Sequence, residues 1–251
     1  IITVDDTEDP VITCPADLTA VCDISEQPAY TSYAEFVAAG GSASDNCAID
    51  ESSFILLSEE SDGLTCPETV TRTYQIADLC GNTDTCTQDI VVDDTEDPVI
   101  TSSPDDVTVQ CIEDVPAADI GLVTATDNCD GVTITHVGDV SDGGSCPEVI
   151  TRTYRATDDC GNYTEVTQTI TVNDTEDPVI TCPADLSVQC IGDVPEPDIS
   201  SVTATDNCDG VTITWLGDES DGNTCPEIIT RTYQAEDDCG NTATCTQIIT
   251  V

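Results

Sequence analysis

Carboxylate and amide side chains are concentrated in three short motifs that recur along the chain. One is the acidic segment Asp-Thr-Glu-Asp-Pro, the second is Asp-Asn-Cys, and the third is a loop that ends in Cys-Gly-Asn. Hard cations such as calcium take six to eight oxygen ligands from carboxylates, amides and carbonyls, so these motifs predict calcium sites if they meet in space. The candidate ligands are Asp6, Glu8, Asp9, Asp45, Asn46, Asp78, Asp94, Glu96, Asp97, Asp127, Asn128, Asp158, Asp174, Glu176, Asp177, Asp206, Asn207 and Asp237.

These acidic residues are also compatible with two roles that need no cation. Asp and Asn close turns, because their side chains bond nearby backbone groups. A large acidic excess can equally serve solubility, as on halophile-like surfaces. No segment has the D-x-D-x-D-G spacing of an EF-hand, so the sequence does not select among the carboxylates.

The motifs recur because the chain is a tandem repeat. The string Asp-Thr-Glu-Asp-Pro-Val-Ile begins at positions 6, 94 and 174, and Thr-Arg-Thr-Tyr begins at positions 71, 151 and 230. This similarity predicts three Ig-like repeats at 5–92, 93–172 and 173–251. Residues 1–4 match the last strand of a repeat, so we expect the chain to be an excerpt from a longer array.

Each repeat is predicted to be all-β. In the third repeat, alternation of apolar residues with Thr and Gln predicts strands at 179–190, 202–205, 211–216, 228–236 and 242–251. Short strands separated by Asp-Gly and Gly-Asn turns are typical of an Ig-like β-sandwich. We therefore expect tandem, disulfide-stapled sandwiches arranged end to end as an extended rod. The first repeat has an insertion, and its segment 33–39 is predicted to form a short turn of helix.

This strand order brings the three acidic motifs to one end of each repeat. If strand 202–205 runs up, then 211–216 runs down, 228–236 up and 242–251 down. The loops 206–210 and 237–241 then share the upper end, where the acidic segment before the first strand also lies. Calcium at or near each inter-repeat junction would rigidify the array, as in cadherin-like chains.

The 16 cysteines favour disulfides over zinc, because the chain has only one histidine and no paired C-x-x-C spacing. The middle repeat lacks one pair, since the position of Cys14 falls at Ser102 or Ser103 and that of Cys86 at Val166. This joint loss predicts Cys14–Cys86 and Cys182–Cys245. For the other cysteines, the strand directions favour short-range pairs within each repeat. These are Cys22–Cys66, Cys47–Cys80, Cys111–Cys146, Cys129–Cys160, Cys190–Cys225 and Cys208–Cys239.

The charge excludes several classes of partner. The chain has 51 Asp and Glu against 4 Lys and Arg, a net charge of −47. It therefore lacks the basic footprint that binds nucleic acid and the basic clusters that bind anionic membranes. No apolar run approaches the roughly 20 residues of a membrane span, so we expect no membrane insertion. The many cysteines indicate an oxidising, extracellular compartment.

No arrangement of residues predicts catalysis. His136 occupies the position of Trp215 on the predicted core face of a strand, and one histidine in one repeat excludes a repeated Ser-His-Asp arrangement. The carboxylates lie on predicted convex turns, which gives glycosidase chemistry no support. Arg72, Arg152 and Arg231 recur once per repeat, and we expect each to form a structural ion pair with a nearby carboxylate.

The motifs taken together resemble a known family. The strings D-T-E-D-P-V-I-T-C-P-A-D-L, A-T-D-N-C-D-G-V-T-I-T and D-x-C-G-N-x-x-x-C are similar to the HYR (hyalin repeat) type of Ig-like domain. They are most similar to the cysteine-containing version found in tandem on large cell-surface adhesins of Bacteroidota, including SprB-like gliding-motility adhesins. The resemblance covers all three repeats and implies secretion, cell-surface display, adhesion and no catalytic residues.

The sequence therefore predicts a non-enzymatic segment of an extracellular adhesin or filament, a spacer or adhesive stalk stabilised by calcium and disulfides. Its expected partners are neighbouring repeats of the same long chain, and surface glycans or other cell-surface proteins. One alternative is an array of carbohydrate-binding modules, which would need an exposed aromatic residue in every repeat, although aromatics make up only 4% of the chain. The second alternative is the accessory stalk of a secreted enzyme whose catalytic residues lie outside this chain.

Overall fold

A computed structural model describes residues 5–129, 131–208 and 210–251, so the strand predicted at 1–4 lies outside the described residues. The chain forms two compact units. The first comprises the residues through Ser102 with 123–135 and 155–165, and the second comprises 103–122, 136–154 and 166–251. Each unit therefore contains one outer repeat and part of the middle repeat. The repeat boundaries 5–92, 93–172 and 173–251 stay a prediction.

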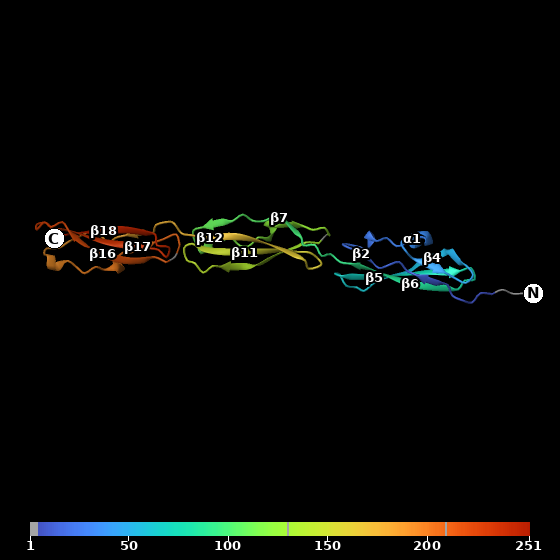
Figure 1. The fold of residues 1–251 in the computed structure, drawn as a ribbon. Helices are drawn as coiled ribbons and strands as arrows, with labels where there is room; N and C mark the ends of the chain where they lie inside the picture. Colours follow the sequence, from blue (N-terminus) through green and yellow to red (C-terminus); the bar gives the residue numbers. More distant parts are fainter. Residues whose placement is uncertain (1–4, 130, 209) are drawn as a thin grey trace, which may run out of the picture. The chain divides into compact units, whose positions relative to one another are not determined.

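The first repeat contains a four-stranded sheet and a two-stranded sheet (Figure 1). The larger sheet has the order β2-β6-β5-β4, with β2 parallel to β6 and the other pairs antiparallel. Its strands are β2 (Leu18–Ala20), β4 (Ile49–Ser61), β5 (Glu68–Asp78) and β6 (Thr83–Val92). The smaller sheet pairs β1 (Val11–Thr13) with β3 (Ser42–Ser44). A 3-10 helix, η1 (Ile24–Glu26), follows β2.

The other two repeats have the same plan. In the middle repeat the sheet β10-β11-β12-β8 comprises β8 (Val107–Val109), β10 (Thr133–Ser141), β11 (Glu148–Thr157) and β12 (Tyr163–Val172), and β7 (Val99–Ser102) pairs with β9 (Thr124–Thr126). In the third repeat the sheet β14-β18-β17-β16 comprises β14 (Leu186–Ser187), β16 (Thr212–Ser220), β17 (Ile228–Glu236) and β18 (Thr242–Thr250), and β13 (Val179–Thr181) pairs with β15 (Thr203–Thr205). The 3-10 helices are η2 (Ile112–Asp114), η3 (Ile120–Leu122), η4 (Ile191–Asp193) and η5 (Ile199–Ser201).

The predicted all-β, tandem sandwich-like fold is confirmed, and the differences lie in individual strands. The predicted strand 228–236 coincides with β17, and β18 ends one residue before the predicted strand 242–251. The predicted strand 179–190 is instead divided into β13 and β14, which pair with different sheets. Pro183 lies between them, and a proline interrupts strand pairing because it has no N–H to donate. β16 is longer than predicted and pairs directly with β17.

Alternating burial forms the core of each repeat. Along β17, Ile229, Arg231, Tyr233 and Ala235 are buried, while the residues between them are partly exposed. Tyr233 and its counterparts Tyr74 and Tyr154 are among the most deeply buried side chains. Half-buried alternation of this kind is expected when one face of a sheet packs against a second layer.

The insertion in the first repeat adds a helix to this core. The helix α1 (Tyr33–Ala38) begins after Ser32, whose hydroxyl accepts a hydrogen bond from the Glu35 N–H at 3.3 Å. Phe36 is fully buried and packs against Phe54 and Tyr74. The short helix predicted at 33–39 is therefore confirmed. Among the described residues, no helix has the length and apolarity needed to cross a membrane.

Each repeat contains one buried arginine in an ion pair with an acidic residue of the neighbouring strand, as predicted. Arg72 pairs with Glu59 at 2.7 Å, and Arg152 pairs with Asp139 at 2.8 Å. Arg231 pairs with Asp218 at 2.7 Å. The same guanidinium groups also donate to carbonyl oxygens of the loops after β2, β8 and β14, on Gln27, Pro116 and Pro195. These loops contain Cys22, Cys111 and Cys190, so the arginines help to fix the backbone beyond these cysteines.

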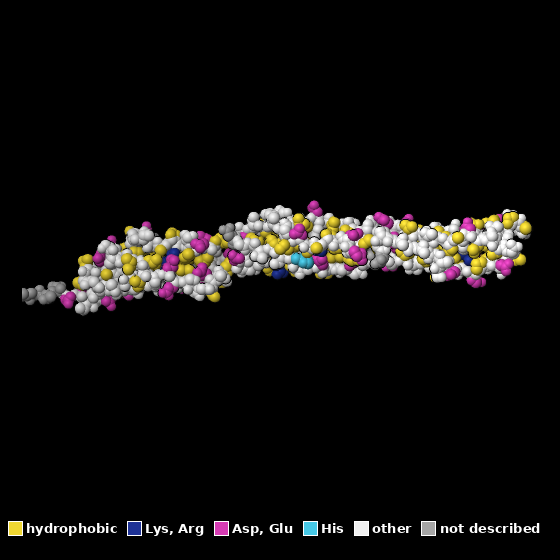
Figure 2. Space-filling view, turned by 180° about the vertical axis from the view of Figure 1, so that it is seen from behind, with side chains coloured by type: hydrophobic (Ala, Val, Ile, Leu, Met, Phe, Trp, Pro, Cys, Tyr) yellow, Lys and Arg dark blue, Asp and Glu magenta, His cyan; other side chains and the backbone are white. Residues whose placement is uncertain are grey.

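His136 and Trp215 lie on the face of the sheet that carries the buried tyrosines, as predicted, but on an edge strand. Both side chains are exposed. The His136 ring bonds Asp139 at 2.9 Å, and the Trp215 ring N–H donates to Asp218 at 3.0 Å. Trp215 is the strand partner of the buried Tyr233, and the His136 ring centroid lies 5.7 Å from that of Tyr154, so both side chains lie beside the core tyrosines at the edge of the sheet. Figure 2 shows acidic side chains over one face of the molecule, with few basic ones among them.

Candidate cation site and disulfide junctions

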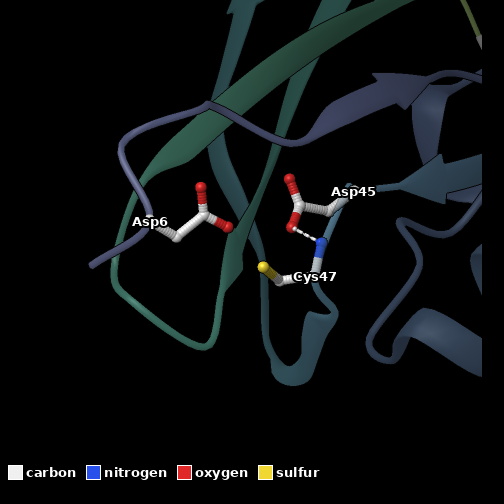
Figure 3. A group of neighbouring side chains, drawn as sticks. All are labelled: Asp6, Asp45 and Cys47. Atoms are coloured by element: carbon white, nitrogen blue, oxygen red, sulfur yellow. Dashed lines mark hydrogen bonds between the residues drawn. The ribbon is translucent and has the colours of Figure 1, made fainter. Parts of the chain in front are cut away.

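The structure brings together two of the three predicted acidic motifs in every repeat. Asp6 lies beside Asp45 in the first repeat, Asp94 beside Asp127 in the second, and Asp174 beside Asp206 in the third. In each group, one carboxylate oxygen from each aspartate and the sulfur of the following cysteine lie within 4.8 Å of one another. Figure 3 shows the first group, in which the Asp6 and Asp45 carboxylates face a common space that the Cys47 sulfur also borders. We call each facing pair of aspartates an acidic pair.

One aspartate of each acidic pair belongs to the Asp-Asn-Cys motif, which forms a tight turn. One of its carboxylate oxygens accepts the N–H of the following cysteine, at 2.8 Å for Asp45, 3.0 Å for Asp127 and 3.1 Å for Asp206. The other oxygen of Asp127 and of Asp206 is buried without a hydrogen-bond partner. In the first repeat the buried oxygen without a partner belongs to Asp6. Buried carboxylate oxygens are nearly always bonded, so each of these oxygens is suited to a cation.

The other aspartate of each acidic pair belongs to the acidic segment between repeats. Asp94 and Asp174 are buried, with exposed fractions of 4% and 6%. One oxygen of Asp174 accepts the Glu176 N–H at 3.0 Å and the Asn207 amide at 3.2 Å, and Asp94 has the equivalent bonds. Two carboxylates therefore face each other in a largely desolvated place.

This proximity changes the ionisation of the carboxyl groups. Burial and the facing Asp174 together raise the pKa of Asp206 above its usual value. Burial also opposes ionisation of Asp94, but the Glu96 N–H and the Asn128 amide donate hydrogen bonds that lower its pKa overall. In the first repeat, the adjacent Asp6 carboxylate, together with burial, raises the pKa of the Cys47 thiol to about 11. Without a cation, the pair Asp174–Asp206 carries a repulsive cost at neutral pH.

In the presence of a chelator, lowering the pH toward 4 is expected to raise the contribution of Asp206 to the thermal unfolding midpoint. A carboxyl group with a raised pKa in the folded state contributes its full stability below its unfolded pKa of about 4, and this contribution is lost as the pH rises through the raised value. Scanning calorimetry in EDTA at several pH values would measure the slope of the unfolding midpoint against pH. The variant Asp206→Asn removes the titrating group and is expected to flatten it, and equal slopes in the two proteins would contradict the assignment.

The third predicted motif plays a different part, because its aspartate is fully engaged in hydrogen bonds. Asp78 is buried and accepts the backbone N–H groups of Cys80, Gly81 and Asn82 on one oxygen and the Asn82 amide on the other. Asp158 and Asp237 hold the equivalent asparagines at 2.8 Å. The structure therefore places these three aspartates in a loop-closing role and outside the acidic pairs.

The asparagine that ends this motif was not among the predicted site residues, although it positions the acidic pair. Asn82 donates its amide to the backbone carbonyl of Asp6 at 3.1 Å. Asn162 and Asn241 make the same bond to Asp94 and Asp174, at 2.9 and 3.1 Å. The recurrence of Cys-Gly-Asn in every repeat was a signal for such a role, but the sequence did not indicate where the amide points.

The remaining predicted ligands lie around the acidic pairs. The asparagines of the Asp-Asn-Cys motif are exposed and use their amide N–H groups on the neighbouring aspartate, as Asn128 does on Asp94 at 3.1 Å. The other acidic residues of the inter-repeat segment are exposed, and none belongs to the acidic clusters found among the described residues. These are Glu8, Asp9, Glu96, Asp97, Glu176 and Asp177.

Disulfides occur both within repeats and between them. Cys14 bonds Cys86 and Cys182 bonds Cys245, the pairs expected from their joint absence in the middle repeat. Four further disulfides each join one repeat to the next, and they lie in pairs that we call junctions. The first junction consists of Cys22–Cys129 and Cys66–Cys160, and the second of Cys111–Cys208 and Cys146–Cys239. Each junction lies within one compact unit.

These bonds replace six pairings predicted within single repeats, which the structure does not contain. Four are excluded by the junction disulfides, and the cysteines of the other two, Cys47, Cys80, Cys190 and Cys225, carry no disulfide. The six pairings are Cys22–Cys66, Cys47–Cys80, Cys111–Cys146, Cys129–Cys160, Cys190–Cys225 and Cys208–Cys239.

The reason for this difference is the absence of a spacer between repeats. The parallel pairing of β2 with β6 continues past Val92, since the Asp93 N–H donates to the Ala20 carbonyl at 3.1 Å. Cys22 therefore lies beside the start of the second repeat's acidic segment. Glu68 at the start of β5 is paired with Val92, which brings the neighbouring Cys66 to the same place. The cysteines at the lower end of one repeat thus meet those at the upper end of the next.

Comparisons with known proteins agree with the repeated motifs. The family described as "HYR-like domain with 4 cysteines" matches residues 99–172 and 178–251, which together exceed half of the chain. A search of curated proteins found no match to this chain.

The solved structures that match this chain include cadherin ectodomain fragments of low sequence identity. A protocadherin gammaB7 EC3-6 cis-dimer is 13% identical, with a TM-score of 0.32, over 97% of this chain and 77% of that chain. Drosophila N-cadherin EC1-4 is 15% identical, with a TM-score of 0.32, over 98% and 76%. Mouse cadherin-23 EC22-24 is 14% identical, with a TM-score of 0.31, over 98% and 99%.

Proposed function

The chain belongs to the family of HYR-like domains with four cysteines, and from this premise we propose that it is a non-enzymatic structural segment of an extracellular adhesin or filament. Its repeats are joined by disulfides, and each acidic pair binds a divalent cation, for which we propose calcium. Disulfides on this scale are typical of an oxidising, extracellular compartment. Six disulfides occur among the described residues.

One observation carries the cation proposal, namely the buried carboxylate oxygens that have no hydrogen-bond partner. The oxygens of Asp127 and Asp206 each face a second buried carboxylate, on Asp94 and Asp174. Leaving a buried acceptor without a partner is costly, and a facing like charge adds to the cost. A calcium ion would supply the missing partner, with water completing the six to eight oxygen ligands that it prefers. The Cys129 and Cys208 sulfurs are in disulfides and supply no thiolate.

The finer features of this function rest on the resemblance of the motifs to the HYR type of Ig-like domain. We propose display at the cell surface, in the manner of the SprB-like gliding-motility adhesins of Bacteroidota. In that setting the repeats act as a spacer or adhesive stalk arranged end to end as an extended rod, and surface glycans or other cell-surface proteins are its ligands. Exposed aromatics do not recur at one position, since the exposed Trp215 is replaced by His136 in the middle repeat. An array of carbohydrate-binding modules is therefore the less favoured function.

Addition of calcium to chelator-treated protein is expected to raise the thermal unfolding midpoint. With a dissociation constant of 10⁻⁴ to 10⁻³ M, as in extracellular calcium modules, 10 mM calcium stabilises each site by about 1.4 to 2.7 kcal/mol. Calorimetry in EDTA, followed by calcium add-back, measures the shift, and isothermal titration counts the sites. An unchanged midpoint together with no binding heat would disprove the cation proposal and leave the disulfide-linked stalk intact.

Matched variants test whether the acidic pairs are the residues that bind calcium. Asp206→Asn removes a charge from the pair in the third repeat and is expected to remove one calcium from the titration. Glu219→Gln makes the same charge change at an exposed residue of β16 and is expected to leave the number of sites unchanged. A titration in which both variants lose calcium equally would indicate diffuse binding to the acidic surface.

A further inference from the structure

Both disulfides of the second junction line one cavity, which has a volume of about 360 Å³ and lies within the second compact unit. Cys111 and Cys208, which form one disulfide, contribute to its wall, as do Cys146 and Cys239, which form the other. A small thiol in this cavity therefore reaches both of the bonds that join the middle repeat to the third. We propose that the cavity is a thiol–disulfide exchange site that accepts positively charged thiols and excludes negatively charged ones.

The polar part of the cavity wall is acidic. Four carboxylate side chains line it, and none of the described residues around it is a lysine or an arginine. The four are Glu113, Glu148, Asp174 and Asp238. The first two belong to the middle repeat and the last two to the third, so a thiol that approaches the disulfides passes between carboxylates from both repeats.

Negative charge is held beside the sulfur atoms themselves. One oxygen of Asp174, one oxygen of Asp206 and the sulfur of Cys208 lie within 4.8 Å of one another. Asp238 directly precedes the cysteine of the other disulfide, and its carboxylate lies against Gly210, in the loop that follows Cys208. Gly210 has a φ of +105°, and a Cβ at this position would collide with the Asp238 carboxylate. Glycine therefore allows this carboxylate to lie between the two loops that carry the cysteines.

The cysteines of the two disulfides differ in their exposure to solvent. Cys111 is only 7% exposed, whereas its partner Cys208 is partly exposed. In a disulfide exchange the attacking thiolate bonds one sulfur and expels the other, so access decides which sulfur is attacked. In this disulfide the accessible sulfur is that of Cys208, which lies beside the two aspartates. Cys146 and Cys239 in the second disulfide are both partly exposed.

The acidic wall selects among thiols because the attacking species is the thiolate, which is itself an anion. The thiolate of 3-mercaptopropionate carries a second negative charge, whereas the ammonium group of cysteamine cancels the charge of its thiolate. A cleft lined by one sign of charge raises the local concentration of the opposite charge, which changes association rates by roughly ten- to a thousandfold. Glu113 and Asp238 are exposed to solvent, so we expect the lower end of this range.

The exchange is balanced with the cationic thiol as its only co-reactant. The first thiolate forms a bond to the Cys208 sulfur, and the Cys111 sulfur leaves as a thiolate. A second thiolate then attacks the sulfur of the first thiol in the mixed disulfide, and the Cys208 sulfur leaves. Two molecules of thiol are thus oxidised to one disulfide, while one protein disulfide is reduced to two thiols. The two thiol protons pass through water to Cys111 and Cys208.

The test exposes the full chain to cysteamine, 2-mercaptoethanol and 3-mercaptopropionate, which carry a positive, a neutral and a negative group. In low-salt buffer with EDTA, samples are quenched with acid, alkylated and peptide-mapped, so that the loss of each disulfide is timed separately. The rate at the second junction is divided by the rate at Cys182–Cys245, whose partly exposed cysteines do not line the cavity. This ratio cancels the different acidities of the thiols. We expect it to be about tenfold higher with cysteamine than with 3-mercaptopropionate, and intermediate with 2-mercaptoethanol.

Two variants connect this preference to the cavity. Glu113→Gln with Asp238→Asn removes two of the four carboxylates and leaves the acidic pair intact, so the tenfold preference is expected to fall to about threefold. Glu196→Gln with Glu219→Gln makes the same change of charge at two exposed residues that do not line the cavity. This control is expected to keep the full preference.

Three results would overturn the proposal. One is an equal rate ratio for the three thiols. The second is a preference that persists in 1 M salt, where the Debye length is only about 3 Å and charge selection is expected to disappear. The third is an equal preference in the cavity variant and its control. The salt series uses the unmodified chain, so it decides the question even if a variant does not fold. EDTA is present throughout, so the outcome does not depend on the calcium proposal.

Discussion

A chain without the second junction is expected to lose roughly 4.7 kcal/mol of unfolding free energy for each disulfide removed, by the chain-entropy estimate for loops of this size. The variant replaces four cysteines by serine, and the two bonds that it removes span 97 and 93 residues. Loops of this length leave the unfolded chain far more freedom when they are opened, which is the physical source of the loss. Thermal and denaturant unfolding under oxidising conditions measure it. The replaced residues are Cys111, Cys146, Cys208 and Cys239.

A matched control distinguishes the contribution of the junction disulfides to stability from that of a disulfide within one repeat. Cys182→Ser with Cys245→Ser removes a disulfide that spans 63 residues within the third repeat, and it leaves the junction intact. Limited proteolysis distinguishes the two variants, because only the junction variant is expected to be cut in the inter-repeat segment 173–177. If the junction variant unfolds at the same denaturant concentration as the unmodified chain, the junction disulfides contribute nothing to stability.

Local patterns in the sequence were sufficient for the strands that form the core. Thr-Arg-Thr-Tyr and the residues around it alternate strictly, and the predicted strand 228–236 is the observed β17. Such alternation is informative because one face of the strand must be buried. The prediction was less accurate for β13 and β14, where Pro183 interrupts the pairing and the chain passes from one sheet to another. Partner choice in a sheet depends on tertiary contacts that a period cannot encode.

Comparison of the repeats with one another identifies only some of the disulfide pairs. The loss of one pair in the middle repeat identified Cys14–Cys86, because two bonded residues are dispensable only together. The other four cysteines occur in every repeat, so no repeat reports on their pairing. Near-identical repeats also make Cys208 equally compatible with Cys239 of its own repeat and with Cys111 of the preceding one. Only the direct continuation of one repeat into the next decides between them.

The three acidic motifs were predicted to meet at one end of each repeat, but only two of them supply the facing carboxylates of the acidic pairs. Asp206 lies against Asp174 with a buried free oxygen, whereas Asp237 is satisfied by hydrogen bonds from its own loop. Both residues are aspartates that precede a cysteine motif, and the sequence does not distinguish them. The difference arises in the local turns. The loop after Asp237 directs its backbone N–H groups at the Asp237 carboxylate, whereas the turn after Asp206 leaves one Asp206 oxygen without a donor.

Replacing Arg152 by alanine is expected to lower the free energy of unfolding by about 2 to 3 kcal/mol. This is at the lower end of the cost of breaking a buried ion pair, because Arg152 is 5% exposed but its partner Asp139 is 34% exposed. The guanidinium donates to both Asp139 oxygens and to the Pro116 carbonyl, so the variant removes three hydrogen bonds. Urea unfolding of the variant and the unmodified chain measures the difference.

The same strand supplies a matched control in Arg155, which is three residues further along β11. Arg155 pairs with Glu165 in an exposed contact and lies over the Tyr163 ring, and Arg155→Ala is expected to cost less than about 1 kcal/mol. The hydrogen bond from Arg152 is the main reason that the pKa of Asp139 is lowered to about 2. This stabilisation is therefore complete above about pH 4 and is lost as the pH falls toward 2. Arg152→Ala is expected to weaken that acid-induced loss, while Arg155→Ala leaves it unchanged, and equal effects of the two variants would show that burial of the ion pair has no energetic consequence.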